Sequence, residues 1–285
     1  MTAIILALQT PIYFFTAPTL FHTLMRIVKN AEFSKIKYDF LLENSNMIGY
    51  NALVVQYGGN KMDNHCIYAS VNMFGSVGAI GDSYTAASVE NSEGKWIDVV
   101  AQSWVGTLCK RAGVPFSKYG KGGATTKSYL DDRMSDVLNS MPNDAYFFAL
   151  GINDSNRDLE LGTIDDIHDD DFTKNPDTFY GCYGKIIAQV KNHAPKARLI
   201  MVKIMTNGSK KLNYDNAIED IARHYGIPFI SPYDDDFFSS EAYNDYMVGG
   251  HPTAMGYSMI GLAMERLFSK CVTDNLDYFK FSTVG

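Results

Sequence analysis

Cysteine is scarce and scattered in this 285-residue chain. The four cysteines, Cys66, Cys109, Cys182 and Cys271, lie far apart and form no Cys-x-x-Cys motif. This spacing is neither a zinc signature nor the dense disulfide framework of a small secreted domain. We therefore predict free cysteines, and the redox compartment stays open.

Basic residues and long apolar runs are also lacking. Lys and Arg number 25 against 32 Asp and Glu, a net charge of -7, whereas a nucleic-acid-binding protein presents a basic patch. No apolar run approaches the roughly 18 residues of a membrane helix. The apolar residues 3–8 lack a basic flank and are followed by Pro11 and Pro18, so we expect a core strand there and not a cleaved signal. We expect no nucleic-acid partner and no membrane partner.

Motifs for phosphate or metal binding are missing as well. Gly122-Gly123 is not followed by the Gly-Lys-Ser/Thr of a P-loop. The acidic tract 165–171 lacks the spacing, the glycine and the terminal glutamate of an EF-hand, and a solvated loop accounts for it. We expect neither a cofactor nor a metal.

The composition is that of a soluble globular protein with a large core, since 46% of the residues are hydrophobic and 20% are charged. Residues 1–74 differ in character from the rest. Apolar and polar residues alternate over 35–42, and apolar runs at 52–57 and 67–74 predict further strands, with a short helix over 20–29. We predict a β-rich accessory segment at 1–74 and a main domain at 75–285.

The main domain alternates apolar strands with amphipathic helices. The strands are predicted at 77–80, 114–119, 145–150, 198–202 and 228–230. The helices between and after them are predicted over 96–112, 130–137, 179–190, 214–225 and 254–268. A strand that is apolar throughout, such as 145–150, suits a parallel sheet covered on both faces. The pattern therefore predicts an α/β fold, a doubly wound three-layer α/β/α sandwich with five parallel strands.

Polar and glycine-rich segments follow these strands. They are Ser83, 120–126, 151–154 and 249–253. Because ligands of open α/β sheets bind at the carboxyl ends of the strands, we expect these segments to face one pocket. Ser83 is then either the N-cap of the next helix or a nucleophile.

Together these segments supply the groups that ester hydrolysis needs. A serine hydroxyl is a weak nucleophile and needs an adjacent base, for which histidine is suited near neutral pH. The oxyanion of the tetrahedral intermediate needs preorganised donors, which a glycine backbone N–H and an asparagine side chain provide. We expect Asp82 to bond loop backbone and Asp154 to tether a loop.

These residues resemble the SGNH (GDSL-type) hydrolase family of serine esterases and acylhydrolases. Four blocks carry the resemblance: Gly81-Asp82-Ser83, Gly123, Gly151-Ile152-Asn153-Asp154, and His251-Pro252 followed by Gly256-Tyr257. Each block alone is weak, but together they stand in the family's order over about residues 76–270.

The resemblance implies a flavodoxin-like sheet and a site. In that site Ser83 is the nucleophile and His251 the base. The backbone N–H groups of Ser83 and Gly123 and the Asn153 side chain form the oxyanion hole. Tyr84 and Asp154 are further candidates for lining the substrate pocket.

One position departs from the family pattern. The family usually places an aspartate three residues before the histidine, and here that residue is Val248. A backbone carbonyl could orient His251, leaving a Ser-His dyad. Another acid could replace the aspartate, and the candidates are Asp245 and one of Asp234, Asp235 and Asp236 after the fifth strand. The site could also be degenerate.

The expected function is hydrolysis of a carboxylic ester, with a small acyl group such as acetyl on a carbohydrate. A lipase or thioesterase is the alternative among enzymes. The alternative outside enzymes is a catalytically weakened glycan-binding or structural module, which the β-rich segment 1–74 and Val248 motivate. The segment around Ser83, the segment 146–154 and the His251-Pro252-Thr253-Ala254 block also resemble hydrolase domains of phage and prophage surface proteins. Substrate identity, oligomeric state and export stay open.

Overall fold

A computed structural model describes residues 54–55, 66–67, 70–206 and 209–280 of the chain. The elements predicted over 3–8, 20–29 and 35–42 lie outside the described residues. Strands β1 (Val54–Val55) and β2 (Cys66–Ile67) form a two-stranded sheet. The division predicted at residue 75 stays a prediction, and the fold below is that of the larger unit, which includes Ile67–Gly285.

The core of this unit is a five-stranded sheet with the order β6-β3-β7-β8-β9. Its strands are β3 (Val77–Gly81), β6 (Phe116–Gly120), β7 (Ala145–Ala149), β8 (Arg198–Val202) and β9 (Phe229–Ile230). Every neighbouring pair is parallel, which confirms the predicted sheet.

The sheet is doubly wound. From β3 the chain goes to β6 at one edge, then crosses to β7 on the other side of β3 and continues outward to β9. The winding direction therefore reverses between β3 and β7, and crevices for ligands lie beyond the carboxyl ends of the strands at such a point.

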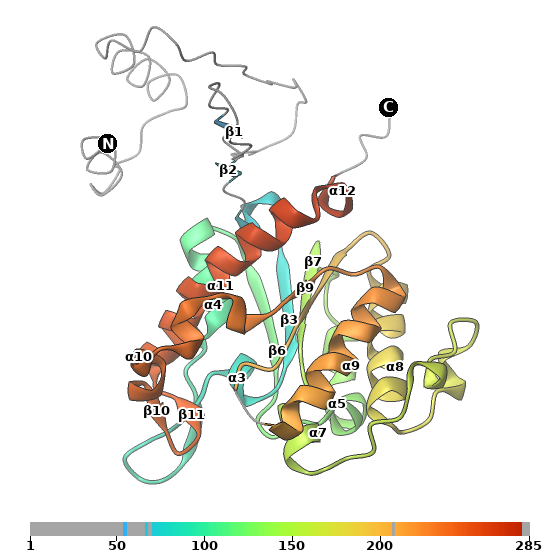
Figure 1. Ribbon diagram of the computed structural model, residues 1–285, viewed down its shortest axis with the longest axis horizontal. Helices are drawn as coiled ribbons and strands as arrows, with labels where there is room; N and C mark the ends of the chain where they lie inside the picture. The colour runs from blue at the N-terminus through green and yellow to red at the C-terminus, as the bar shows by residue number, and fades with distance from the viewer. Residues whose placement is uncertain (1–53, 56–65, 68–69, 207–208, 281–285) are drawn as a thin grey trace, which may run out of the picture. The chain divides into compact units, whose positions relative to one another are not determined.

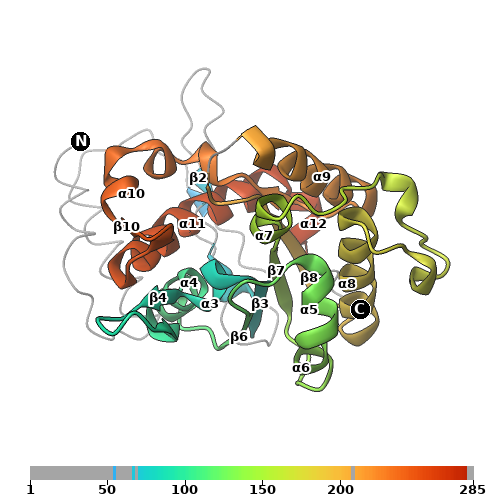
Figure 2. The ribbon, with the colours of Figure 1, turned by 90° about the horizontal axis from the view of Figure 1, so that it is seen from below.

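Helices cover both faces of the sheet (Figure 1, Figure 2). One face packs against α4 (Trp104–Ala112) and α11 (Ala254–Asp274), and the core there includes Trp104, Phe147 and Phe268. The other face packs against α5, α6, α8 and α9, and this core includes Phe148 and Ile186. The bounds of these four helices are Thr126–Asp132, Met134–Leu138, Phe179–His193 and Ser209–Tyr225. The three-layer α/β/α sandwich is confirmed.

Short elements connect these layers. The helices among them are η1 (Val71–Met73), α3 (Ser83–Ala86), η2 (Val100–Gln102), α7 (Ile152–Asn156), η3 (Ile164–Asp166), η4 (Phe172–Lys174), η5 (Pro232–Asp234), η6 (Asp236–Ser239), α10 (Glu241–Asp245) and α12 (Leu276–Phe279). The strands among them form two hairpins, β4 (Ser88–Glu90) with β5 (Trp96–Asp98), and β10 (Met247–Val248) with β11 (His251–Pro252).

Two local predictions are wrong. The helix expected from Trp96 begins only at Trp104, where the Ser103 hydroxyl accepts a hydrogen bond from a backbone N–H. Trp96–Asp98 is instead strand β5, because a turn around Asn91 brings it back onto β4. The strand expected over 67–74 does not extend through η1, where Val71 and Phe74 turn into the core beside α4.

The three cysteines whose side chains are described, Cys109, Cys182 and Cys271, are free and buried, as predicted. Among the described helices, none has the length and apolar character needed to cross a membrane.

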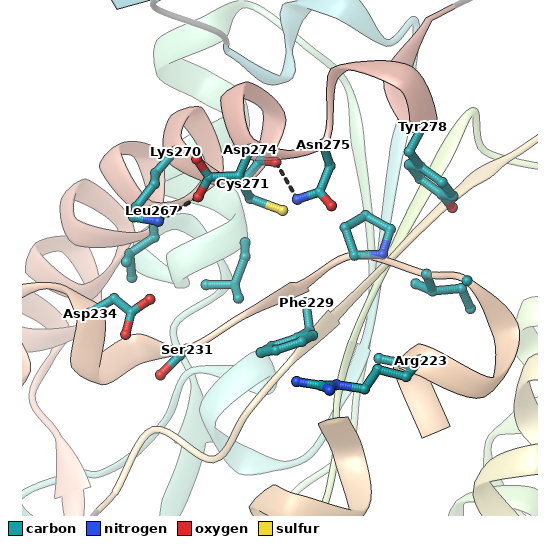
Figure 3. A pocket seen from close by; sticks show the side chains of 15 residues that line it. Arg223, Phe229, Ser231, Asp234, Leu267, Lys270, Cys271, Asp274, Asn275 and Tyr278 are labelled. Carbon is teal, nitrogen blue, oxygen red and sulfur yellow. Dashed lines mark hydrogen bonds and ion pairs between the residues drawn. The ribbon is translucent and has the colours of Figure 1, made fainter. Parts of the chain in front are cut away.

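A cavity of about 470 Å³ lies beside the edge strand β9, between the end of α9 and the end of α11 (Figure 3). Phe229, Arg223 and the ion pair between Lys270 and Asp274 are among the residues that line it. Asp234, one of the candidate acids, also lines it, whereas Ser83, Gly123, Asn153 and His251 do not.

Candidate active site

Three of the predicted site segments follow strands β3, β6 and β7, whose carboxyl ends are aligned. Gly81 at the end of β3 is in register with Gly120 of β6 and with Ala149 of β7. The residues that follow these strand ends therefore lie along one edge of the sheet.

Ser83 is the first residue of α3 and not its cap. The cap is Asp82, whose carboxylate accepts a hydrogen bond from the Tyr84 N–H at 2.9 Å. This confirms a structural role for Asp82. Ser83 is buried, with 7% of its surface exposed.

The Asp82 carboxyl has a pKa well above its usual value. It is buried, and burial raises its pKa to about 7, against the opposing effect of the Tyr84 N–H. A cavity of about 20 Å³ lies between Asp82, Tyr84 and the ends of β7 and β8. A buried carboxyl with a raised pKa therefore stands directly before Ser83 in the chain.

His251 reaches Ser83 from a different part of the chain. Its Nε2 lies 2.8 Å from the Ser83 Oγ, although 168 positions separate the two residues. His251 is the first residue of β11, and the turn before it is Gly249-Gly250, with φ of 58° and 80°. A two-residue hairpin turn with positive φ at both positions is type I′, for which glycine is suited.

The other ring nitrogen of His251 meets no carboxylate. Nδ1 is buried, and within the described part of the chain it forms no hydrogen bond of ordinary geometry. Burial lowers the pKa of the imidazole, and a weak hydrogen bond to the backbone of Gly249 raises it by less. The ring is therefore held in the neutral form at neutral pH.

Neither predicted acid meets His251. Asp235 instead accepts two hydrogen bonds from the Arg266 guanidinium, at 2.7 and 2.8 Å, and one from the Phe237 N–H. Asp245, at the end of α10, forms no hydrogen bond to the imidazole. Val248 stands directly opposite His251 in the hairpin, with 58% of its surface exposed.

Aromatic rings surround His251 instead. The Trp96 and imidazole ring centroids are 4.5 Å apart, and those of Tyr84 and the imidazole are 5.8 Å apart. The Tyr84 hydroxyl donates to the Gly250 carbonyl at 3.1 Å, and the Tyr257 hydroxyl donates to the Ser88 carbonyl at 3.0 Å. Tyr84 is thus buried, with its ring beside the imidazole.

Trp96 was missed as a site residue. The sequence segment around it reads as the start of a helix, and only the hairpin with β4 carries it to His251. The available signal for a strand was composition, since Trp96 and the β-branched Ile97 are residues enriched in strands.

The segments after β6 and β7 are tied together. Gly123 has φ of 72° in a tight turn closed by the Ala124 N–H and the Lys121 carbonyl. The Asn153 side chain donates through Nδ2 to the Ala124 carbonyl at 3.0 Å. No acceptor among the described residues takes up the N–H of Gly123 or of Ser83.

Asp154 is fully buried and holds these two segments together. Its carboxylate accepts from the Thr126 N–H at 3.0 Å and from the Thr126 hydroxyl at 2.7 Å. Burial raises the pKa of the carboxyl, and the bonds from Thr126 oppose this. The expected tether is confirmed, whereas substrate cannot reach Asp154.

The described residues contain no group of three or more histidine, cysteine or acidic side chains arranged to hold a metal ion. The site is built of a hydroxyl, an imidazole, backbone N–H groups and a carboxamide.

A serine hydroxyl paired with an imidazole at the carboxyl edge of a doubly wound parallel sheet defines a serine hydrolase of the α/β class. A family model, GDSL-like Lipase/Acylhydrolase family, matches residues 79–259. The chain belongs to this family, and it is an esterase-type hydrolase.

Solved structures share the fold at low identity. A protein described as a GDSL-like lipase from Bacteroides uniformis is 20% identical with a TM-score of 0.53, covering 70% of this chain and 96% of that one. The corresponding protein from Bacteroides ovatus is also 20% identical with a TM-score of 0.53, covering 68% and 98%. A carbohydrate esterase family 2 enzyme with a carbohydrate-binding domain, from Corynascus thermopiles, is 14% identical with a TM-score of 0.50, covering 70% and 66%. No curated protein matches the chain.

Proposed function

We propose that this protein hydrolyses a carboxylic ester with Ser83 as nucleophile and His251 as general base. The contact of 2.8 Å between Ser83 Oγ and His251 Nε2 carries the proposal. In the productive tautomer the proton is on Nδ1, and Nε2 accepts the serine hydroxyl proton as Oγ attacks the ester carbonyl.

The negative charge of the tetrahedral intermediate then falls on the former carbonyl oxygen. The Ser83 and Gly123 N–H groups and the second N–H of the Asn153 carboxamide are the proposed donors, since none of them has an acceptor among the described residues. His251 returns the proton to the leaving alcohol, and water activated by the same imidazole releases the acid.

The proposed substrate is a small acyl ester, such as an acetyl group on a carbohydrate. Trp96 supports this, because its ring lies against His251 and half of its surface is exposed, so an aromatic face borders the nucleophile. Aromatic faces of this kind also suit the apolar face of a sugar ring.

A longer acyl chain is the second candidate. Large exposed apolar side chains are found at Trp96, at Val248 opposite His251, and at Met255 in the first turn of the following helix. Apolar surface in the segments that carry the base favours a lipase- or thioesterase-type substrate.

Ser83 labelling tests the proposal directly. A serine-reactive fluorophosphonate is expected to label the native chain and the control variant Ser128→Ala, but not Ser83→Ala. Hydrolysis of p-nitrophenyl acetate is expected to fall by at least about 10³-fold in both Ser83→Ala and His251→Ala. Equal labelling of the native chain and Ser83→Ala contradicts the proposal. Glycan binding without hydrolysis of any ester would favour the binding-module alternative.

The acyl group is tested with esters of increasing length. Preference for p-nitrophenyl acetate over the octanoate, together with release of acetate from acetylated xylo-oligosaccharides, is the expected result. A rate that rises from acetate to octanoate would instead favour the longer chain.

A further inference from the structure

His251 lacks the usual means of orientation. Its Nδ1 is buried, and the two carboxylates expected there, Asp235 and Asp245, are not bonded to it. The group that bonds the imidazole on this side is the Gly249 backbone, and that bond is weak. A catalytic imidazole held only weakly at Nδ1 depends on the side chains packed against it to keep Nε2 at the serine.

The contact that the structure offers is aromatic. The indole of Trp96 lies 4.5 Å from the imidazole by ring centroids, with an angle of 59° between the planes. Tilted pairs at this separation are a favoured arrangement of aromatic rings. Tyr84 adds a second ring at 5.8 Å, and its hydroxyl is bonded to the carbonyl of Gly250, directly before His251.

Trp96 is itself held in place by its hairpin. Its strand β5 pairs with β4 over three residues, with Trp96 opposite Glu90. Asp98 at the end of β5 accepts from the Ser88 hydroxyl at 2.8 Å and from Lys118 at 3.3 Å. The backbone that carries the indole is therefore held in place, and half of the Trp96 surface is exposed.

We propose that Trp96 is a positioning residue that holds the His251 imidazole toward Ser83 in place of a carboxylate at position 248. This inference rests on the proposed role of His251 as the base. An aromatic contact fixes the direction of the ring but does not select which nitrogen carries the proton. Nδ1–H faces the Gly249 backbone and not a carboxylate, so the productive tautomer is favoured less than in a triad and turnover is slower.

Other polar and titratable groups lie around the His251 imidazole, and a test must distinguish their influence from that of Trp96. The hydroxyls of Tyr84 and Tyr257 lie on α3 and α11, and the carboxyl of Asp82 precedes Ser83. The β4–β5 hairpin carries Asp98, bonded as described, and Glu90, whose carboxylate would lie 3.7 Å from a Cβ added at Gly249. Of these groups, Glu90 is the one whose carboxylate lies near the hairpin turn and could hold the His251 ring in place of Trp96.

The test compares Trp96→Ala, Trp96→Phe and Ile97→Ala on p-nitrophenyl acetate. Ile97 is the matched control, because it is similarly exposed and adjacent residues of a strand point to opposite faces. Trp96→Ala is expected to lower kcat about three- to tenfold with KM changed less than about twofold, while Trp96→Phe and Ile97→Ala stay within about twofold of the native enzyme.

A second measurement does not need turnover. Ring ¹H–¹⁵N NMR of histidine, with His251→Gln to assign the signal, follows the His251 pKa. In the native chain this pKa is expected below its usual 6.5. It is expected to rise toward 6.5 in Trp96→Ala, where water reaches the ring, and to stay low in Trp96→Phe and Ile97→Ala.

Three results would overturn the proposal. A raised KM with unchanged kcat in Trp96→Ala would make the indole a substrate platform only. An equal loss in Trp96→Phe and Trp96→Ala, with an unchanged His251 titration, would make it structural. A loss in Glu90→Gln as large as in Trp96→Ala would assign the positioning to the carboxylate.

If the NMR shift occurs in a chain without esterase activity, the proposed function fails while the positioning contact stands.

Discussion

The two halves of the site are held by different kinds of interaction. The nucleophile side, defined here as residues 81–86, 120–126 and 151–156, follows three adjacent strands and is fixed by the buried carboxyls Asp82 and Asp154. The base side, residues 88–98 and 247–252, consists of two short hairpins outside the main sheet.

The difference lies in how polar groups are satisfied. On the nucleophile side, Asp154 accepts from both polar groups of Thr126, and Asn153 is anchored to Ala124. On the base side, the buried Nδ1 of His251 meets no carboxylate among the described residues and forms only a weak hydrogen bond to the Gly249 backbone, while aromatic rings pack against the imidazole. The sheet therefore fixes the nucleophile and the donors, while the base depends on looser contacts.

The largest effect is expected from removing a donor on the nucleophile side. Asn153→Ala should lower kcat/KM for p-nitrophenyl acetate about 10²- to 10³-fold, about 3–4 kcal/mol, because the oxyanion loses a preorganised N–H. Asn156→Ala, an exposed asparagine at the end of the same helix, is the control and should stay within about twofold. A loss below about fivefold in Asn153→Ala would remove Asn153 from the oxyanion hole.

The buried carboxyl of Asp82 should make stability depend on pH. Its pKa of about 7 in the folded chain lies above the value of 3.8 expected when unfolded, so folding takes up a proton between these values. The stabilisation is complete below pH 4 and is lost as the pH rises toward 7.

Urea unfolding of the native chain and of Asp82→Asn from pH 5 to 8 measures this loss. The native chain should lose on the order of 3 kcal/mol of unfolding free energy relative to the variant over this range. His251 titrates in both proteins, so its opposite contribution cancels in the comparison. A constant difference between the two proteins would contradict the raised pKa.

The smallest effect should be a gain in kcat from a substitution on the base side. Val248 stands opposite His251 in the hairpin, and side chains of directly opposed residues lie on the same face about 5 Å apart. Val248→Asp should therefore place a carboxylate near Nδ1 and raise kcat about tenfold, about 1.4 kcal/mol, by favouring the productive tautomer.

Val248→Asn, of the same shape but uncharged, is the control for this gain. The gain should be larger in a Trp96→Ala background, since the carboxylate then supplies the orientation that the indole provided. No gain in either background would show that the tautomer does not limit turnover.

Much of this architecture follows from local pattern. The apolar run Ala145–Leu150 and the helical spacing of Phe179, Tyr183 and Ile186 are set by neighbouring residues, and the structure matches both. The start of α4 was misplaced because Trp96 and Ile97 suit an amphipathic helix and a strand equally well. Only the pairing with β4 decided between them.

By itself the sequence determined that the sheet is parallel, the succession of strands and helices along the chain, and the four segments that carry Ser83, Gly123, Asn153 and His251. These depend on periodicity and on short motifs, which are local properties of a chain. Tertiary structure decided what surrounds the base. It paired Asp235 with Arg266, left Nδ1 without a carboxylate, and brought Trp96 against His251, because contacts between segments far apart in the chain leave no trace in local pattern.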